Sequence, residues 1–200
     1  MKTIFIEAGH GKSAIGTKDP GAVGNGQTER QMVVIIARKV IDILRTKEEL
    51  KDVLIQGVGV ETEANLRGKI NFVNKVISEN KFFPSDCISL SIHMNSSYSS
   101  KPAGFEVWYQ KVPRPKKIEY AESMVRAWEN YKITPVRPKA AQPTSLNHWK
   151  RLYIDDFLCP AVLVETSFIS NPADVAAITK NYERVAECLA HGLLEHIRSL

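Results

Sequence analysis

The stretch of sequence that decides the fold runs from Pro160 to Glu165 and reads PAVLVE. The uninterrupted apolar run from Ala161 to Val164 is typical of a strand that is buried on both faces. Strands of this kind belong to parallel sheets that helices cover on each side. The run therefore predicts an α/β domain built in layers.

Strands and helices are predicted to alternate along the rest of the chain. Residue patterns predict strands at residues 2–6, 52–56, 87–92 and 104–110, and helices at residues 28–45, 63–80, 118–131 and 182–197. Residues 131–150 are rich in proline and are predicted to be irregular. The alternation favours a single α/β domain over residues 1–200 with a largely parallel or mixed sheet.

Length and composition agree with one globular domain. The chain has 200 residues, of which 44% are hydrophobic, and can bury one large core. The longest apolar run, Met32–Ala37, is far shorter than the roughly 20 residues of a membrane-spanning helix, so no membrane partner is expected. Cys87, Cys159 and Cys188 show no C-x-x-C spacing and are expected to be buried thiols.

Charge and the N-terminus give broad expectations about partners and location. A formal net charge of +5 favours polyanions in general. The basic segment Lys111–Lys117 has no interleaved aromatic residue and no nucleic-acid motif accompanies it, so it is expected to be a solvated loop with no nucleic-acid partner.

Residues Met1 to Glu7 lack the hydrophobic region of a secretory signal, which predicts synthesis in the cytoplasm. The chain is expected to act as a monomer.

Two histidines near the ends of predicted strands are candidate metal ligands. His10 directly follows the first strand between Gly9 and Gly11, which leave room around an imidazole. His93 lies on the strand face of Ser91 and is expected to point into a polar pocket. Each also has an ordinary interpretation: His10 as a loop histidine, and His93 as a satisfied histidine of the core.

Two glutamates stand where an isolated charge would be costly. Glu29 precedes Val33 by four residues on the predicted helix, so its carboxylate faces inward and needs a cation nearby. Its alternative role is that of a surface glutamate stabilised by the helix dipole. Glu165 ends the buried strand, where ligands of open α/β sheets gather, and its alternative role is a simple ion pair with a lysine.

Two histidines and a carboxylate are a known catalytic zinc set, with the fourth position left for water. His10, Glu29 and His93 are therefore candidate ligands of one zinc ion. Hydrolysis also needs a carboxylate that takes the proton of the water and delivers one to the leaving amine, a role that suits Glu165. The two histidines of the last predicted helix are five residues apart and cannot chelate one ion from that helix alone.

Four sequence blocks resemble the zinc-dependent N-acetylmuramoyl-L-alanine amidases of the type called amidase 3. The blocks are IFIEAGHG (4–11), DPGAVGNG (19–26) followed by Glu29, SIHMN (91–95), and VLVE (162–165) continued by SNP (170–172). They span nearly the whole chain in the order of the family, which makes the resemblance specific.

The resemblance implies that His10, Glu29 and His93 hold one zinc ion and that Glu165 is the catalytic glutamate. The implied fold is a twisted, mostly parallel six-stranded sheet between helices. The implied reaction is hydrolysis of the amide that joins N-acetylmuramic acid to the L-alanine of the peptidoglycan stem peptide.

Some positions depart from the family without removing a proposed ligand. The family usually has aspartate where Glu7 stands, and glycine at Lys12 and near Ser167. These departures bear on pocket shape and specificity. Asn95 and Asn171 match motif positions, and structural roles in turns and loops are expected for them.

Peptidoglycan is the partner that the resemblance implies, and no separate wall-binding domain is expected. Because this substrate lies outside the cytoplasm, a chain without an export signal would be released by a lysis or holin-type route, as a phage endolysin is, or would belong to a larger exported protein. A zinc peptidase acting on free peptides and a non-catalytic wall-binding module are the alternative functions. Nucleic-acid binding driven by net charge ranks last.

Overall fold

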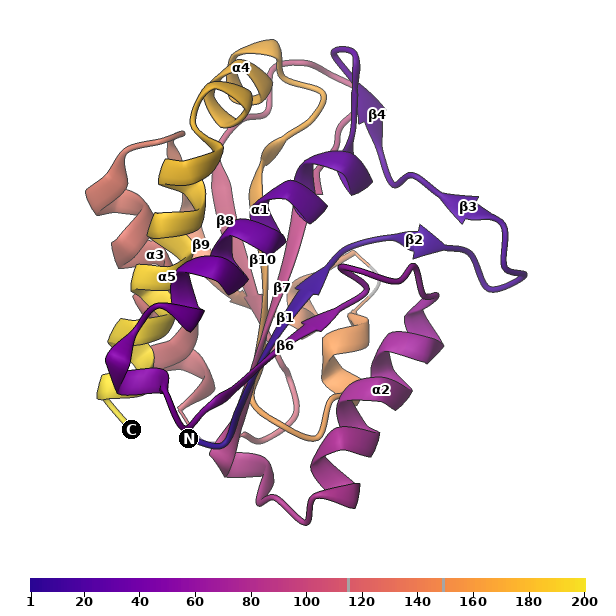
Figure 1. Cartoon of the computed structure of the whole chain (residues 1–200). Helices are drawn as coiled ribbons and strands as arrows, with labels where there is room; N and C mark the ends of the chain where they lie inside the picture. Colours follow the sequence, from indigo (N-terminus) through magenta and orange to yellow (C-terminus); the bar gives the residue numbers. More distant parts are fainter. Residues whose placement is uncertain (115, 149) are drawn as a thin grey trace.

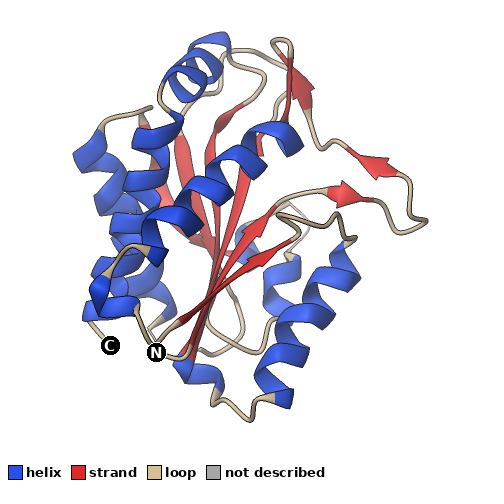
Figure 2. Ribbon diagram, in the orientation of Figure 1, coloured by secondary structure: helices blue, strands red, loops and turns tan. Residues whose placement is uncertain are grey.

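A six-stranded sheet crosses the centre of the protein in the order β6-β1-β7-β10-β8-β9 (Figures 1 and 2). The strands are β1 (Thr3–Ala8), β6 (Leu54–Val58), β7 (Cys87–Asn95), β8 (Phe105–Tyr109), β9 (Val136–Pro143) and β10 (Ala161–Phe168). Neighbouring strands are parallel except β8 and β10, which are antiparallel. The computed structural model describes residues 1–114, 116–148 and 150–200. The predicted mostly parallel sheet is confirmed.

Helices cover both faces of this sheet (Figure 1). On one face α1 (Glu29–Arg45) and α3 (Lys117–Tyr131) both pack against α5 (Tyr182–Arg198), and on the other lies α2 (Leu66–Glu79). The short helix α4 (Pro172–Lys180) follows β10. The result is the layered α/β architecture that the sequence predicts.

Two short ribbons extend from the end of β1. The first pairs β2 (Gly11–Lys12) with β3 (Lys18–Asp19), and the second pairs β4 (Val23–Gly24) with β5 (Gln27–Thr28). They form the glycine-rich connection between β1 and α1. This connection carries side chains that meet at the end of the sheet.

Strand β10 is buried on both faces, as its apolar run predicts. Val162 and Val164 belong to the core that α1, α3 and α5 cover. Ala161 and Leu163 belong to a second core, which also contains residues of α2. Because β10 pairs with β7 on one side and β8 on the other, Glu165 lies in the interior of the sheet rather than at an edge.

The prediction that residues 131–150 are irregular is wrong for residues 136–143, which form the edge strand β9. An edge strand forms ladder hydrogen bonds on one side only, so proline, which lacks a backbone N–H, is tolerated there. Because of Pro138 and Pro143, the sequence pattern of this strand is that of an irregular segment. Residue 149 of this segment and residue 115 of the basic segment lie outside the described residues.

Helix boundaries follow local capping. The hydroxyl of Thr28 accepts the backbone N–H of Gln31 at 3.3 Å and starts α1. The side chain of Asn65 accepts the N–H of Gly68 at 2.8 Å, so α2 begins at Leu66 rather than at residue 63. The predicted strand 52–56 is observed two residues later, at Leu54–Val58. Helix α4 has no counterpart in the sequence prediction.

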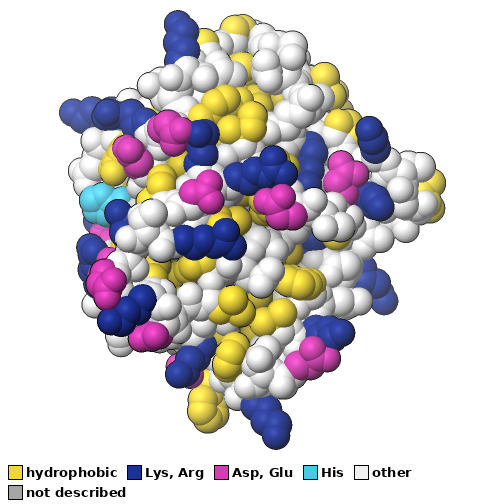
Figure 3. All heavy atoms as spheres, in the orientation of Figure 1, with side chains coloured by type: hydrophobic (Ala, Val, Ile, Leu, Met, Phe, Trp, Pro, Cys, Tyr) yellow, Lys and Arg dark blue, Asp and Glu magenta, His cyan; other side chains and the backbone are white. Residues whose placement is uncertain are grey.

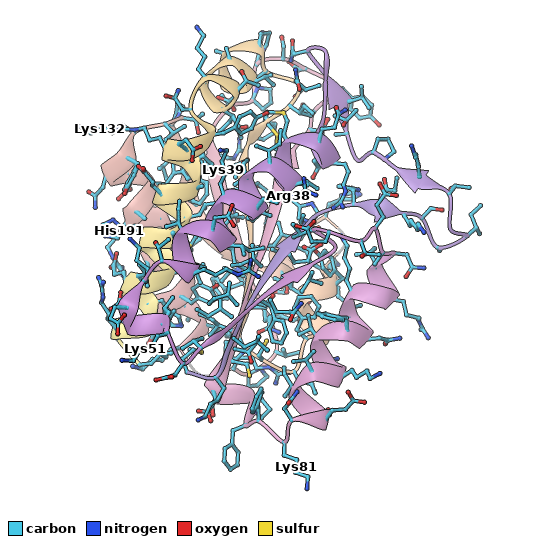
Figure 4. All side chains as sticks on the ribbon, viewed as in Figure 1. Arg38, Lys39, Lys51, Lys81, Lys132 and His191 are labelled. Atoms are coloured by element: carbon cyan, nitrogen blue, oxygen red, sulfur yellow. The ribbon has the colours of Figure 1, made fainter. Side chains whose placement is uncertain are left out.

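Basic and acidic side chains alternate on the face shown in Figure 3. Arg38 and Lys39, which Figure 4 labels on α1, illustrate this pattern. Arg38 lies 3.3 Å from Glu61, and Lys39 pairs with Glu183 of α5. The basic residues of this face are thus interrupted by their acidic partners.

The cysteines and the helix lengths agree with what the sequence predicts. Cys87, Cys159 and Cys188 are free and buried, as predicted. Within the described ranges, no helix is both long and apolar enough to cross a membrane.

Candidate active site

The four candidate residues meet at the carboxyl-terminal end of the parallel strands. His10 follows β1, His93 lies in β7 and Glu165 in β10, and these three strands are neighbours in the sheet. Glu29 is the first residue of α1. One ligand atom each of His10, Glu29 and His93 lies within 4.8 Å of the other two. The fold therefore brings together residues that are far apart in the sequence.

The carboxylate of Glu29 lies between the two imidazoles. Its Oε2 is 3.0 Å from Nε2 of His10, and its Oε1 is 2.9 Å from Nδ1 of His93. The backbone N–H groups of Ala22 and Met94 also donate to it, each at 3.1 Å. Zinc bonds of about 2.0–2.1 Å in tetrahedral geometry place ligand atoms roughly 3.3 Å apart. Both imidazole–carboxylate distances are close to this value, and one atom from each of the three residues lies within 4.8 Å of the others, so the donor types suit a zinc ion that draws them closer together.

The ionisable groups of this cluster shift one another's pKa. Burial alone would raise the pKa of Glu29, but hydrogen bonds from His10 and His93 outweigh burial and lower it. Burial alone would lower the pKa of His10, but Glu29 and Asp19 outweigh burial and raise it to about 9. Glu29 is thus an anion that requires positive charge beside it, as the sequence argument anticipates.

The second nitrogen of each imidazole has its own hydrogen-bond partner. Nδ1 of His10 lies 2.9 Å from Oδ2 of Asp19, and Nε2 of His93 lies 3.0 Å from the hydroxyl oxygen of Tyr153. These contacts leave Nε2 of His10 and Nδ1 of His93 directed at Glu29. Partners of this kind fix the ring orientation of metal-binding histidines.

Two glycines make room for the imidazoles. A Cβ at Gly9 would lie 2.5 Å from Cε1 of His93, and a Cβ at Gly21 would lie 2.6 Å from Cδ2 of His10 and 2.7 Å from Oε2 of Glu29. Gly21 also has a φ of +68°, which L-residues rarely adopt. The glycine before His10 therefore serves the ring of His93 rather than that of His10.

Two buried cations hold the backbone that presents His10. His10 has a φ of 60°, in the left-handed region. Nζ of Lys69 donates to the carbonyls of Ala8 at 2.5 Å and His10 at 2.6 Å. Arg30 donates to the carbonyls of Ala8 at 3.2 Å and Gly9 at 3.1 Å. These bonds satisfy carbonyls beyond the end of β1 and stabilise the sharp turn at His10.

Glu165 lies beside the cluster without a hydrogen-bond partner for one oxygen. Its Oε2 is buried and unpartnered among the described residues. Burial raises its pKa well above the usual value, and repulsion from Glu29 and Glu106 raises it further. The alternative of a simple ion pair with lysine finds no support, because no such pair involves Glu165 in the described part of the chain. A carboxyl group with a raised pKa is suited to carrying a proton.

The two asparagines of the sequence blocks have structural contacts, one beside Glu165 and one at the start of α4. Glu106 lies opposite Glu165 in the β8–β10 register and accepts from Asn95 at 2.8 Å and from Nε of Arg137 at 2.7 Å. Asn171 caps α4, with its side chain accepting the N–H of the residue at position 173 at 2.9 Å. Structural roles for both asparagines agree with these contacts.

Asp19 and Tyr153 belong to the site but were not among the candidates. Asp19 stands in one of the quoted sequence blocks, so its position offered a signal. Tyr153 lies in a short 3-10 turn, Tyr153–Asp156, before β10, and no motif surrounds it. Only the fold brings its hydroxyl to His93.

The remaining histidines of the last helix have other surroundings. His191 packs edge-on against Tyr131, with ring centroids 5.9 Å apart. His196 stacks on Tyr120, with ring centroids 4.4 Å apart. Neither belongs to the metal-ligand cluster found among the described residues.

Fold and site together define an α/β protein in which two histidines and a glutamate converge beyond the ends of parallel strands. Residues 4–195 match the protein family described as N-acetylmuramoyl-L-alanine amidase. The chain belongs to this family, and the resemblance seen in its sequence blocks is confirmed.

Several relatives align over nearly the whole chain. The N-acetylmuramoyl-L-alanine amidase LytC of Bacillus subtilis (strain 168) is 26% identical over 204 residues, covering 98% of this chain and 36% of LytC. The endolysin of Bacillus phage SPP1 is 28% identical over 203 residues, covering 97% of this chain and 65% of the endolysin. The chain thus spans only part of the length of these two relatives.

A solved structure shows the same fold. The catalytic domain of CwlV, an N-acetylmuramoyl-L-alanine amidase from Bacillus (Paenibacillus) polymyxa var. colistinus, superposes with a TM-score of 0.76 at 27% identity. The superposition covers 99% of both chains. The six-stranded α/β unit described above is therefore comparable in extent to that catalytic domain.

Proposed function

We propose that this chain is a zinc-dependent amidase that hydrolyses the bond between N-acetylmuramic acid and the L-alanine of the peptidoglycan stem peptide. Family membership supports the reaction class. The observation that carries the metal dependence is the cluster of His10, Glu29 and His93, whose ligand atoms lie within 4.8 Å of one another. Glu29 is only 3% exposed, and a buried carboxylate between two imidazoles suits a divalent cation.

In this proposal the three ligand residues hold one zinc ion. When bound, zinc supplies Lewis acidity and lowers the pKa of a coordinated water. Asp19 orients the ring of His10 through the 2.9 Å contact at Nδ1. The shape of the site depends on Gly9 and Gly21, which keep the two rings free of steric conflict.

Glu165 is proposed as the general base and acid. Its unpartnered Oε2 is available to accept a proton from the attacking water and to deliver one to the leaving amine. Its environment, buried and facing Glu29 and Glu106, raises its pKa and so favours uptake of the proton from the water. Nearby positive charge at the ligand cluster would favour the ionised form that takes up the proton.

We propose that residues 1–200 form one catalytic domain whose partner is peptidoglycan and whose site of action is the bacterial cell wall. The match to the amidase family over residues 4–195 supports this extent. An endolysin-like role is supported by the similarity to the phage SPP1 protein. Action as a monomer and release by a lysis or holin-type route remain part of the proposal.

The test is digestion of purified sacculi with metal-loaded protein, with and without a chelator. Mass spectrometry should find stem peptides with free L-alanine amino groups released from intact glycan, and the chelator should abolish this release. Added zinc should restore it. Cleavage of free peptides without release from glycan would favour the zinc peptidase instead, and binding to sacculi without any cleavage would favour the wall-binding module.

A further inference from the structure

A chain of polar side chains, three of them buried and one half-buried, lies behind His93 on the side of the ring opposite Glu29. Its members are Lys69, Glu7, Ser91 and Tyr153. Nζ of Lys69 lies 2.5 Å from Oε1 of Glu7. The hydroxyls of Ser91 and Tyr153 both donate to Oε2 of the same carboxylate. The chain ends at Nε2 of His93, which is 3.0 Å from the hydroxyl oxygen of Tyr153.

The hydrogen-bond capacities of these groups fix the direction of the last contact. An ionised carboxylate only accepts, so Glu7 takes the single hydroxyl proton of Tyr153. The oxygen of Tyr153 is then left with lone pairs toward His93 and accepts from Nε2–H. A metal would replace the Nδ1 proton that Glu29 accepts at 2.9 Å, and an imidazole that keeps its proton on Nε2 then has its lone pair on Nδ1.

We propose that Tyr153 is a positioning residue of the metal centre. Its hydroxyl, oriented by Glu7, holds His93 in the Nε2–H tautomer and so directs the Nδ1 lone pair at the metal. This inference rests on the metal site of the proposed function. The hydrogen bonds of the Tyr153 hydroxyl run to Ser91, His93 and Glu7, so we assign it a role through His93 and not on the reacting atoms.

The packing around Tyr153 supports a fixed hydroxyl position. Its ring meets Phe157 edge-on, with centroids 5.8 Å apart, and lies 6.0 Å from the ring of His93. Lys69 balances the charge of Glu7, and both side chains are almost fully buried. The hydroxyl thus has protein partners on both sides, Glu7 and His93, which set its direction.

The experiment is the variant Tyr153→Phe, which removes the hydroxyl and keeps the ring. Competition with a chromophoric chelator measures the zinc affinity of the whole protein at fixed pH. Loss of an outer hydrogen bond to a metal-binding histidine costs about 10- to 100-fold in affinity. We expect a decrease of this size, while denaturation of the metal-free protein reports any change in fold stability separately.

Tyr120→Phe is the matched control. The hydroxyl of Tyr120 is also buried and also donates to β7, at the carbonyl of Ser89 with a length of 3.2 Å, but it does not contact His93. The control should retain zinc affinity within about twofold. Equal zinc affinities of the Tyr153→Phe and Tyr120→Phe proteins would overturn the proposal.

A second measurement does not depend on a variant that folds. Nitrogen NMR of the zinc-loaded wild-type protein identifies which nitrogen of His93 carries the proton. A proton on Nε2 supports the proposal, and zinc on Nε2 overturns it. A wild-type protein that binds zinc but leaves sacculi intact would refute the amidase function alone, since the affinity difference and the tautomer would still stand.

Discussion

The ammonium group of Lys69 lies 2.5 Å from the carboxylate of Glu7, and both side chains are shielded from water. The pair joins α2 to β1 through the second core. Lys69 also donates to two carbonyls at the turn of His10, so one cation serves both the fold and the site. Burial alone would raise the pKa of Glu7, but the charge of Lys69, and next that of His93, outweighs burial and lowers it.

Lys69→Met should therefore destabilise the protein strongly. Removing one member of a buried ion pair leaves an uncompensated charge and costs about 3–5 kcal/mol. Urea denaturation of the metal-free protein measures the change. Lys75→Met on the same helix is the control, because Lys75 is exposed and should change stability by less than about 0.5 kcal/mol. Similar stabilities of the two variants would show that the Lys69–Glu7 pair is not buried in solution.

Gly9→Ala should lose zinc affinity while the sheet remains folded. The new methyl group would lie 2.5 Å from Cε1 of His93, so the ring must leave the position that faces Glu29. We expect at least a tenfold fall in zinc affinity and a matching fall in sacculus cleavage. Gly16→Ala is the control: nothing lies within 4 Å of the added Cβ, and its φ of +82° places the backbone strain of the substitution away from His93. Full zinc content and cleavage in Gly9→Ala would argue against this position of His93.

Glu165→Gln should abolish cleavage of sacculi and spare the metal. Removing a general acid or base typically lowers the rate by about 10²- to 10⁴-fold. Metal analysis and thermal denaturation should give wild-type values or a slight gain in stability, because a carboxyl group that faces Glu29 and Glu106 is replaced by a neutral amide. Glu195→Gln, at a surface pair with Arg126, controls for loss of a carboxylate. Turnover near that of the wild type would exclude Glu165 as the base.

Stability should fall as the pH drops from about 6.5 to 4 because of His196. Burial, and next the charge of Lys116, lowers the pKa of His196 from 6.5 to about 4, and the side chain is 1% exposed. The unfolded chain binds the proton first, so the loss begins below pH 6.5 and is complete below pH 4, reaching about 3 kcal/mol. Denaturant unfolding across this range measures it, and His196→Phe, which keeps the stacking on Tyr120, should show a shallower pH dependence. Identical slopes would mean that His196 is protonated without cost.

The central part of the fold could be predicted because its sequence signals are strong. The apolar run Ala161–Val164 is buried on both faces, and the capping pair Thr28 and Gln31 marks the start of α1. The edge strand β9 could not be predicted in this way. Its sheet contacts come from β8, and its prolines match the composition of a loop.

The site was predictable where chemistry and position coincide in the sequence. Glu29 and Glu165 are charged residues on the apolar face of a helix and in an otherwise apolar strand, respectively. Because an isolated buried charge is costly, this position identifies them as candidates without a structure. The roles of His10, Glu29 and His93 as metal ligands stay predictions, although the fold brings them together. Tyr153 gives no such signal, because its contact with His93 joins residues 60 positions apart and depends on the packing of a short turn.

Strand β9 also determines where the sheet ends. Lys139 interrupts it in the left-handed region with a φ of 54°, and its pairing with β8 shifts register between Phe105 and Val107. With Pro138 beside this irregularity, the outer border offers few aligned N–H groups to another chain. This irregular border is thus poorly suited to pairing with the same border of another copy of the protein.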